Sequence, residues 1–484
     1  MKPGARRPAG NRPRESRPGG VRSARPRRRE SAQALVLTAL EQALELRAPA
    51  DAVLRQFFRS HAELGRRDRG VIAETVFDVL RHRRRYAHFA EAGEGPLALR
   101  LAWLSLDRRH DGEAPAGSVR EAGGSAAPRR DKADWPVGLP RPGERDRAWL
   151  ARARATDPAT LSPAVALSLP DALFEAMCHR FGKQPAMALG RALLEPAPLC
   201  LRANALRTDA GALVERLRTE GLSASARADV PGAVEVAGHP AIERSAAFAA
   251  GDFEVQDAGS QLLALLVGAR RGQAVVDFCA GAGGKTLALA AAMQSTGQVF
   301  ACDVSLARLQ RLRPRLLRSG ASNVQPFAFD SVSDPKLGRL AGRADAVLVD
   351  APCTGTGTLR RNPDLKWRTG VSDLQRLVAE QRAILRAAAR LVKPGGLLVY
   401  ATCSLLAEEN EAQAEWFEAN FPRFEREDAA VALAAAGASL PANAFRECAL
   451  AILPSLHNTD AFYGIRWRLT GKPGEKRADD GVKG

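Results

Sequence analysis

The alternation of strand-like and helical patterns after residue 253 is the strongest constraint on the fold of this 484-residue chain. Short apolar runs read as strands, and between several of them apolar residues recur at three- and four-residue spacing, as in helices. The predicted strands are 274–280, 298–304, 323–329, 344–350 and 396–402. Alternating strands and helices predict a mostly parallel sheet with helices on both faces. Pro314 should kink or interrupt the helix before the third strand.

A glycine-rich loop follows the first predicted strand, at the sheet edge where such folds bind ligands. It reads CAGAGGKT and runs from Cys279 to Thr286. A P-loop would need glycine at position 279, and the dinucleotide pattern GxGxxG meets Thr286 where its third glycine should stand. A nucleoside site fits better, because Asp303 ends the next predicted strand and can bind ribose hydroxyls. A purely structural turn is the alternative.

Two cysteines and an aspartate follow the fourth and fifth predicted strands, at the same edge of the sheet. Asp350 and Cys353 lie in DAPCTGTG, and Cys403 lies in YATCSLLAEEN. A lone buried cysteine is usually a small apolar side chain, but two thiols beside a carboxylate and a cofactor loop suit covalent catalysis. Methylation of a pyrimidine at carbon 5 requires such a set. A thiolate adds to carbon 6, and Asp350, protonated or sharing a proton with N3, holds the Watson–Crick edge; spacing leaves open which thiol attacks.

A helix is predicted directly after Cys403, and its N-terminal dipole would favour the thiolate. Glu408 and Glu409 would oppose that effect if they lay close to the sulfur. The two influences act in opposite directions, so no net change in the reactivity of Cys403 is predicted.

Six motifs together resemble the Sun/Nop-type, RsmB-like family of RNA (cytosine-5)-methyltransferases. They lie in the family's order within about residues 195–470. They are VQDAGSQL, DFCAGAGGKT, DAPCTGTG, NPDLKW, YATCSLLAEEN and LPSLHNTDAFYG. The paired PC and TC cysteines are the most specific of them. They favour RNA, because a DNA cytosine methyltransferase would be expected to rely on the PC cysteine alone.

The resemblance implies a role for each site residue. Cys403 would be the nucleophile, and Cys353 would assist release of the product. The cofactor would be S-adenosylmethionine, with Asp330 placed to meet its adenine amino group. The residues implied in cofactor binding are Cys279, Ala280, Gly281, Ala282, Gly283, Gly284, Lys285, Asp303, Asp330 and Asp350. Ala282 stands where the family commonly has proline, which should loosen the loop, and Ala461 stands where glycine is common, with little expected effect.

The rest of the chain is predicted to precede a Rossmann-like class I methyltransferase domain as separate units. The helical region resembles a NusB-type RNA-binding domain, and the segment after it resembles the small α+β unit that presents RNA in this family. The predicted organisation is a disordered basic tail at 1–30, an all-helical NusB-like region at 31–165 with a flexible insertion at 106–146, a small α+β segment at 166–250, the methyltransferase domain at 251–470 and a disordered tail at 471–484.

The charge of the chain favours a nucleic-acid partner. Its 71 basic and 54 acidic residues give a net charge of +17, and residues 1–30 alone hold 11 basic and two acidic residues. That tail is interpreted either as a nucleic-acid-binding arm or as a solubilising extension. Side chains that could bind RNA, or could equally be structural or solvated, are Arg66, Arg67, Arg81, Arg83, Arg84, Arg85, Arg202 and Arg207.

Composition argues against metal sites and membrane insertion. The seven cysteines form no CxxC pair and the seven histidines form no HxxxH pair, so no metal is expected. Neither an apolar signal-peptide core nor an 18-residue apolar run is found, so a cytoplasmic protein without a membrane partner is predicted. A monomer is expected.

Together these observations predict S-adenosylmethionine-dependent methylation of carbon 5 of a cytosine in RNA, with small-subunit ribosomal RNA preferred. The target base must leave its stack to reach Cys403. The motifs do not separate this substrate from transfer RNA. A non-catalytic RNA-binding or ribosome assembly factor with the same fold is a further alternative, against which the Cys353–Cys403 pair and Asp350 argue.

Overall fold

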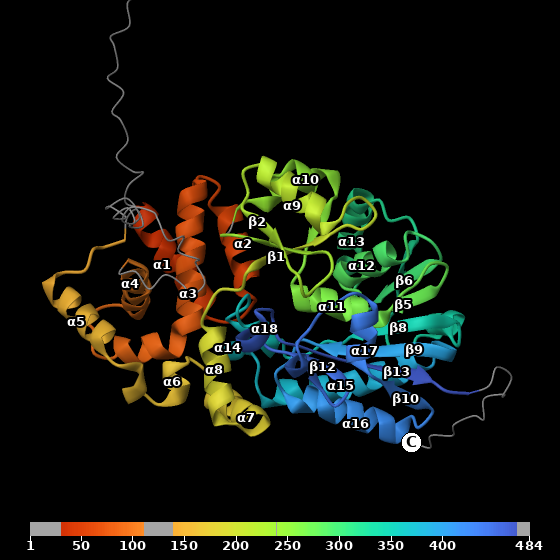
Figure 1. Ribbon diagram of the computed structural model, residues 1–484. Coiled ribbons are helices and arrows are strands. Elements are labelled where there is room, and N and C mark those ends of the chain that lie inside the picture. Colours follow the sequence, from red (N-terminus) through yellow and green to blue (C-terminus); the bar gives the residue numbers. More distant parts are fainter. Residues whose placement is uncertain (1–30, 111–138, 239, 472–484) are drawn as a thin grey trace, which may run out of the picture.

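The computed structural model describes residues 31–110, 139–238 and 240–471. The predicted basic tail, residues 111–138 of the predicted insertion and residues 472–484 lie outside the described residues. Within the described ranges a helical unit, a four-stranded sheet and a nine-stranded sheet follow one another along the chain (Figure 1). No helix in those ranges is long and apolar enough to cross a membrane.

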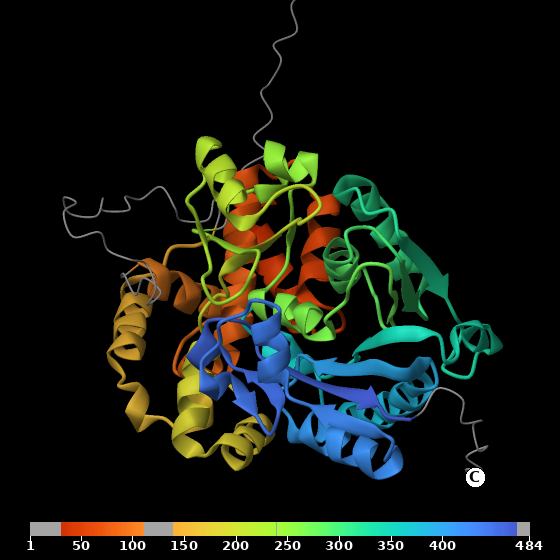
Figure 2. The same cartoon turned by 45° about the vertical axis from the view of Figure 1, so that its right-hand side comes forward.

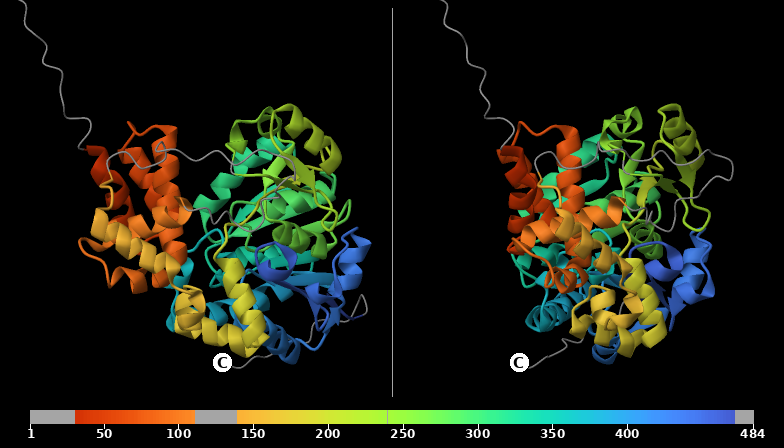
Figure 3. Two further views of the ribbon diagram at one scale, coloured as in Figure 1. Left: turned by 60° about the vertical axis from the view of Figure 1, so that its left-hand side comes forward. Right: turned by 90° about the vertical axis from the view of Figure 1, so that its left-hand side faces the viewer.

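The N-terminal unit is helical, as predicted, and stands to one side of the two sheets (Figure 3). Its core includes Leu40, Val76 and Val79, which are fully buried. The first helices are α1 (Ser31–Leu44), α2 (Ala50–Ser60), α3 (Arg66–Ala90), α4 (Leu97–His110) and α5 (Glu144–Ala155), and the following ones are α6 (Pro163–Ala166), α7 (Asp171–Phe181) and α8 (Lys183–Leu193). The likeness to NusB stays a prediction.

The insertion predicted at 106–146 is too wide at both ends. Helix α4 continues to His110 because Leu106 is buried in the helical core. On the other side Leu139 is buried, and the Trp103 indole donates to the Pro140 carbonyl (2.8 Å). Apolar contacts therefore order both flanks of the segment despite its Gly- and Pro-rich composition.

Helix α3 bends at His82 (φ −104°, ψ 15°), and the two carbonyls just before the bend accept hydrogen bonds from the large-sheet domain. The Trp367 indole donates to the Leu80 carbonyl (2.8 Å), and the Lys366 ammonium donates to the Arg81 carbonyl (2.7 Å). Burial, together with the charge of Arg81, lowers the pKa of Lys366 well below its ordinary value. The NPDLKW motif thus binds the helical unit to the rest of the protein.

Two arginines that could bind phosphates or be structural make structural contacts. Arg81 is buried and donates to the Arg360 carbonyl (2.8 Å). Arg84 donates to both carboxylate oxygens of Asp171 (2.8 and 2.9 Å). These side chains join the helical unit to its neighbours. The predicted phosphate ligands that lie exposed on α3 are Arg66 and Arg67.

The predicted α+β segment forms an antiparallel sheet of order β2–β3–β1–β4. Its elements are β1 (Leu199–Ala203), α9 (Ala210–Thr219), β2 (Ala224–Ala226), β3 (Ala233–Val236), α10 (Ala246–Ala250) and β4 (Phe253–Val255). Arg207 donates to the Ser319 carbonyl (3.1 Å), which joins this sheet to the large-sheet domain. Arg202 is only 9% exposed, and burial lowers its pKa to about 10. Arg202 is therefore not accessible to RNA in this arrangement, whereas Arg207 is exposed and uses only its Nε in the contact with Ser319.

The five predicted strands of the large sheet are all present and pair in parallel, in the order β9–β8–β5–β6–β7. They are β5 (Ala274–Asp277), β6 (Gln298–Asp303), β7 (Val324–Ala328), β8 (Ala344–Asp350) and β9 (Val392–Thr402). An antiparallel extension was not predicted and consists of β10 (Phe424–Glu427), β11 (Phe445–Arg446), β12 (Ala449–Ile452) and β13 (Phe462–Leu469). Strand β13 pairs with β9, and Gly464 and Arg466 interrupt the apolar pattern that would have revealed it.

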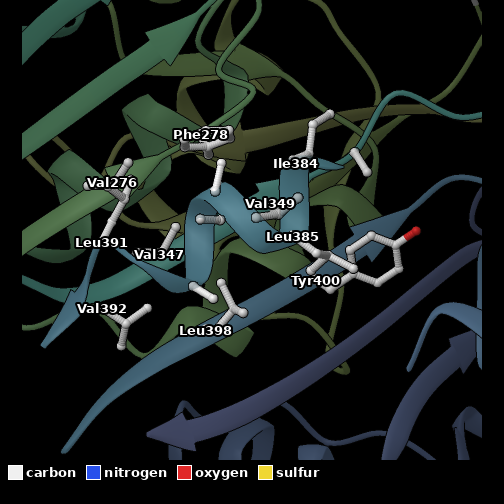
Figure 4. Packing of buried hydrophobic residues seen from close by; sticks show 14 of the residues in the cluster. Val276, Phe278, Val347, Val349, Ile384, Leu385, Leu391, Val392, Leu398 and Tyr400 are labelled. Carbon is white, nitrogen blue, oxygen red and sulfur yellow. The ribbon is translucent and has the colours of Figure 1, made fainter. Parts of the chain in front are cut away.

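Helices cover both faces of the large sheet because successive strand residues point to opposite sides. On β8, Val347 and Val349 face α15 (Val371–Ala389) and α16 (Glu411–Asn420), as Figure 4 shows for α15. Ala346 and Leu348 face the other layer, which includes α11 (Ala258–Val267), α12 (Gly284–Ala292) and α17 (Ala429–Ala435). Figures 1 and 2 show these two layers on either side of the strands.

Helix α13 (Leu306–Ser319) runs through Pro314, where an interruption was predicted. Pro314 and Gln310 lie on the exposed side of the helix, so the Gln310 carbonyl that lacks an N–H partner can bind water. Leu309 and Leu312 are buried on the opposite side and hold the helix against the sheet.

Candidate active site

The glycine loop joins β5 to α12 at the carboxyl edge of the parallel strands. Gly281 and Gly283 have φ values of 56° and 84°, in the left-handed region that favours glycine. A Cβ on Gly283 would also collide with the Leu312 side chain. Asp303, at the end of β6, accepts hydrogen bonds from the N–H groups of Gly281 (2.8 Å) and Ser305 (2.7 Å). Backbone geometry therefore explains these two glycines, and Asp303 fixes the loop.

Gly284 lacks such a backbone reason, because it begins α12 with an ordinary φ. A Cβ there would meet nothing closer than Gln256 Nε2 at 3.8 Å and Arg315 Nη2 at 3.9 Å. The backbone of Gly284, at the N-terminus of α12, is therefore open to the close approach of a ligand, and this open space is called the cradle below. The loop thus fits the close approach of S-adenosylmethionine that the sequence predicted.

Arg315 holds the loop at the position where proline was expected. Its Nη1 donates to the Ala282 carbonyl (2.6 Å), and its Nε and Nη2 donate to Glu254 of β4 (3.1 and 2.8 Å). This contact from outside the loop supplies the restraint that a proline ring would give from within. Ala282 is therefore no obstacle to an ordered cofactor loop.

Asp330 is the predicted cofactor residue that stands apart. Strand β7 ends at Ala328, and the Asp330 side chain is 92% exposed, with its carboxylate 3.5 Å from the Lys336 ammonium. The carboxylate of Asp330 is thus largely exposed to solvent, and its predicted contact with an adenine amino group stays a prediction.

Lys285 and Asp350 form an ion pair between the glycine loop and the end of β8 (Nζ–Oδ2 2.7 Å). Burial alone would lower the pKa of Lys285, but the charge and hydrogen bond of Asp350 outweigh it and raise the pKa. The Lys285 ammonium also lies 5.7 Å from the centre of the Phe462 ring. Asp350 is thus paired with a cation, which the sequence interpretation had not considered.

The two cysteines meet, as their strand ends predicted: the sulfur atoms of Cys353 and Cys403 are 3.3 Å apart, and both are free thiols. The hydrogen bond with Cys403, and then burial, raise the pKa of Cys353 well above its ordinary value. At this distance one thiol can donate a hydrogen bond to the other, and either sulfur could be the donor.

The helix predicted directly after Cys403 does not form there. Residues 403–406 are irregular, a 3₁₀ turn spans Ala407–Glu409, and α16 begins only at Glu411. Hydroxyl groups take the backbone N–H donors of the loop: Thr356 accepts from Leu405 (2.8 Å) and Ser404 accepts from Leu406 (3.0 Å). The helix-dipole argument for the Cys403 thiolate is therefore wrong.

Gly357 is the last glycine of DAPCTGTG, the motif of the loop that carries Cys353 (the PC loop). It connects this loop to the loop that carries Cys403 (the TC loop) and to the C-terminal motif. Its N–H donates to the Cys403 carbonyl (2.8 Å), and its carbonyl accepts from the Ala461 N–H (2.9 Å). A Cβ on Gly357 would collide with the Ala461 carbonyl, which explains the glycine. Ala461 itself has an ordinary φ, so glycine is not required at that position.

Asp277 was not singled out by the sequence interpretation, and Glu409 was considered only as an acid that could oppose a helix dipole. Asp277 ends β5 beneath the loop, accepts from the Thr286 hydroxyl (2.7 Å), and has its other oxygen buried without a hydrogen-bond partner. Burial, and then the charge of Asp350, raise the pKa of Asp277 to about 7. Glu409 is fully buried between the two cysteine loops. In the sequence, Glu409 is the second acidic residue of EEN, a stretch that was interpreted as part of a helix.

In the described ranges, no three His, Cys, Asp or Glu side chains are grouped so that they could hold a metal ion.

Comparisons with known proteins show which family and fold the chain resembles. A family described as "16S rRNA methyltransferase RsmB/F" matches residues 264–467, and an RsmF/B-like "ferredoxin-like domain" matches residues 169–243. A solved protein, PH0851, has the same fold over most of the chain, with a TM-score of 0.68 and 24% identity over 90% of this chain and 98% of that one.

Relatives match a large part of the sequence. The "Probable ribosomal RNA small subunit methyltransferase B" of Bacillus subtilis is 30% identical over 63% of this chain and 67% of its own length. A protein of the same description from Synechocystis is 37% identical over 52% of this chain and 56% of its own length. The chain spans about half the length of the relatives that it matches at this higher identity.

Gly284→Ala tests the cradle at the helix N-terminus. The added methyl group meets no protein atom within 3.4 Å, so stability should be kept, while the dissociation constant for S-adenosylmethionine, measured by calorimetry, should rise at least about tenfold, or about 1.4 kcal/mol. Gly70→Ala on α3, where a Cβ also meets nothing, is the matched control and should bind normally. Unchanged affinity in Gly284→Ala would show that no ligand approaches this glycine.

Asp277→Asn tests the buried carboxyl group by its pH dependence. The folded protein binds this proton more tightly than the unfolded chain, because the pKa rises from 3.8 to about 7. The contribution of Asp277 to stability is therefore full below pH 3.8 and is lost as the pH rises through about 7, with an upper limit of about 4 kcal/mol. Urea unfolding should show this decline in the wild type relative to Asp277→Asn.

The control for the titration is Asp209→Asn at the exposed cap of α9, where asparagine caps equally well. It should follow the wild type at every pH. A constant difference between wild type and Asp277→Asn from pH 4 to pH 8 would contradict the raised pKa.

Proposed function

The chain belongs to the RsmB/F family of 16S rRNA methyltransferases, and from that premise we propose that it methylates carbon 5 of a cytosine in small-subunit ribosomal RNA. The observation that carries the proposal is the pair of thiols 3.3 Å apart beside Asp350 and the glycine loop. S-adenosylmethionine, the cofactor, supplies the methyl group as an electrophilic sulfonium. The cradle at Gly284 and the carboxylate of Asp303 are the parts of the loop that would hold it.

The proposed reaction uses the two thiols unequally. The Cys403 thiolate adds to carbon 6 of the cytosine, which moves electron density to carbon 5 and makes it nucleophilic. After carbon 5 has gained its methyl group and lost its proton, the bond between Cys403 and carbon 6 breaks. Cys353, whose thiol has a raised pKa and lies beside Cys403, is suited to hydrogen-bond the departing sulfur. This agrees with the role in release implied by the family resemblance.

The Lys285–Asp350 pair supports the base during these steps. An ammonium and a carboxylate 2.7 Å apart offer a donor and an acceptor to the Watson–Crick edge, where cytosine presents both kinds of group. Because the pair is largely buried and preorganised, it need not be assembled in the transition state. A proton shared between Asp350 and N3 would then be stabilised by the neighbouring cation.

The choice of substrate follows the names of the relatives, which are ribosomal RNA small subunit methyltransferases. A ribosomal substrate also implies action in the cytoplasm. No feature of the site favours transfer RNA over ribosomal RNA or calls for a second copy of the chain, so monomeric action stays a prediction.

Bisulfite mapping of total RNA from cells with and without the gene tests the substrate. One 5-methylcytosine in small-subunit ribosomal RNA should disappear when the gene is deleted. Loss of a modified position in transfer RNA would replace the proposed substrate with that alternative. If every 5-methylcytosine survived, the non-catalytic alternative would be favoured.

Substitution of each cysteine tests the mechanism. Cys403→Ala should abolish methyl transfer while calorimetric binding of S-adenosylmethionine survives, because the thiol lies outside the glycine loop. Cys353→Ala should accumulate a covalent protein–RNA adduct, seen as a slow-migrating, RNase-sensitive band in a denaturing gel. Cys448→Ala, an exposed cysteine remote in sequence, should behave as wild type. Turnover by Cys403→Ala, or the absence of an adduct with Cys353→Ala, would refute the respective role.

A further inference from the structure

Two thiols whose sulfur atoms are 3.3 Å apart must differ in reactivity if one is to attack and the other to assist release. Glu409 is a buried acidic residue that contacts both cysteine loops. Its carboxyl group lies under the PC and TC loops and is 0% exposed. The groups that donate to it come from Thr354, Ser404 and Gln381, and all are uncharged. Glu409 therefore has no counter-ion among its hydrogen-bond partners.

The contacts of Glu409 are not shared equally between the two cysteine loops. Oε1 accepts from the Thr354 N–H (2.9 Å), the peptide group that directly follows Cys353, and Oε2 accepts from the Thr354 hydroxyl (2.5 Å). The TC loop reaches the carboxylate only through the Ser404 hydroxyl (2.5 Å). Gln381 of α15 fills the remaining position (3.0 Å). Thr354, the residue after Cys353, thus donates two hydrogen bonds to the carboxylate, whereas the TC loop donates one.

This asymmetry acts on the thiols through charge. The charge of Glu409 contributes to the rise in the pKa of Cys353, after the hydrogen bond with Cys403 and burial. Two other charged groups near the loops occur as ion pairs: Lys285 is bonded to Asp350 at the sheet edge, and Arg180 of α7 is bonded to Glu411 at the start of α16. The hydrogen-bond partners of Glu409, in contrast, carry no charge.

We propose that Glu409 is a positioning residue that makes the two thiols unequal: its carboxylate keeps Cys353 neutral as a hydrogen-bond donor and leaves Cys403 as the attacking thiol. This inference rests on the proposed function only in that Cys403 attacks. It explains why a glutamate stands at a site where every partner donates, because a carboxylate is an acceptor only and an amide is not.

Competitive alkylation of the full chain tests the proposal without RNA or cofactor. Limiting iodoacetamide is applied between pH 6 and pH 10, and the labelled peptides are quantified by mass spectrometry. In the wild type, Cys403 should be labelled faster than Cys353. In Glu409→Gln the labelling of Cys353 should begin at lower pH, and the ratio of the two labelling rates should fall at least about threefold.

Glu408→Gln is the matched control, because Glu408 is the adjacent residue and is exposed. It should keep the wild-type ratio. Glu409→Asp keeps the charge but withdraws it by one methylene group, so its ratio should lie between those of the wild type and Glu409→Gln. That variant also carries the test if Glu409→Gln does not fold.

A merely structural Glu409 would lower the melting temperature of its variants without changing the order in which the thiols react. An unchanged ratio and an unchanged pH profile of Cys353 in a folded Glu409 variant would overturn the proposal. Since labelling requires no methyl transfer, failure of this inference and failure of the proposed function are distinguishable.

Discussion

The parallel register of β8 and β9 is the constraint on which the site depends. It sets Asp350 opposite Ala401, so both strands end at the same level of the sheet. Cys353 and Cys403, far apart in sequence, can then bring their sulfur atoms within 3.3 Å. The neighbouring pairing of β5 with β8 places the glycine loop at the same edge, where Lys285 reaches Asp350. A slip of one residue in either pair would turn alternate side chains to the opposite face and separate these groups.

Local patterns were sufficient to predict the five parallel strands and the residues that follow them. A buried parallel strand has a continuous apolar sequence, and its chemistry lies where that sequence stops. Features that depend on distant contacts could not be predicted in this way. Glu409 looked like part of an exposed helix, because the hydroxyls of Thr356 and Ser404, which take the N–H groups of the loop, were not visible as partners. Strand β13 was missed for a similar reason, since its pattern depends on contacts with β9.

The contacts of the arginine residues were predicted less well than the positions of the cysteines. A guanidinium group binds phosphates, but it also binds carbonyls and carboxylates with the same fork of donors. Arg84 and Arg207 use that capacity within the protein, on Asp171 and on the Ser319 carbonyl. The positive charge of a sequence therefore indicates which partners its arginines could bind, but not which partner each arginine does bind. A thiol has fewer alternatives, which is why Cys353 and Cys403 could be placed from their motifs.

The bend in α3 has a consequence for how the protein can be divided. Trp367 and Lys366 donate to carbonyls that belong to the helical unit, and the chain from Cys353 to Trp367 also carries Gly357, which holds the TC loop. A fragment without the helical unit would leave an indole N–H and a buried ammonium without their acceptors, on the same stretch of chain that carries Cys353. The helical unit is thus not a detachable module, because the large-sheet domain depends on its carbonyls to satisfy buried donors.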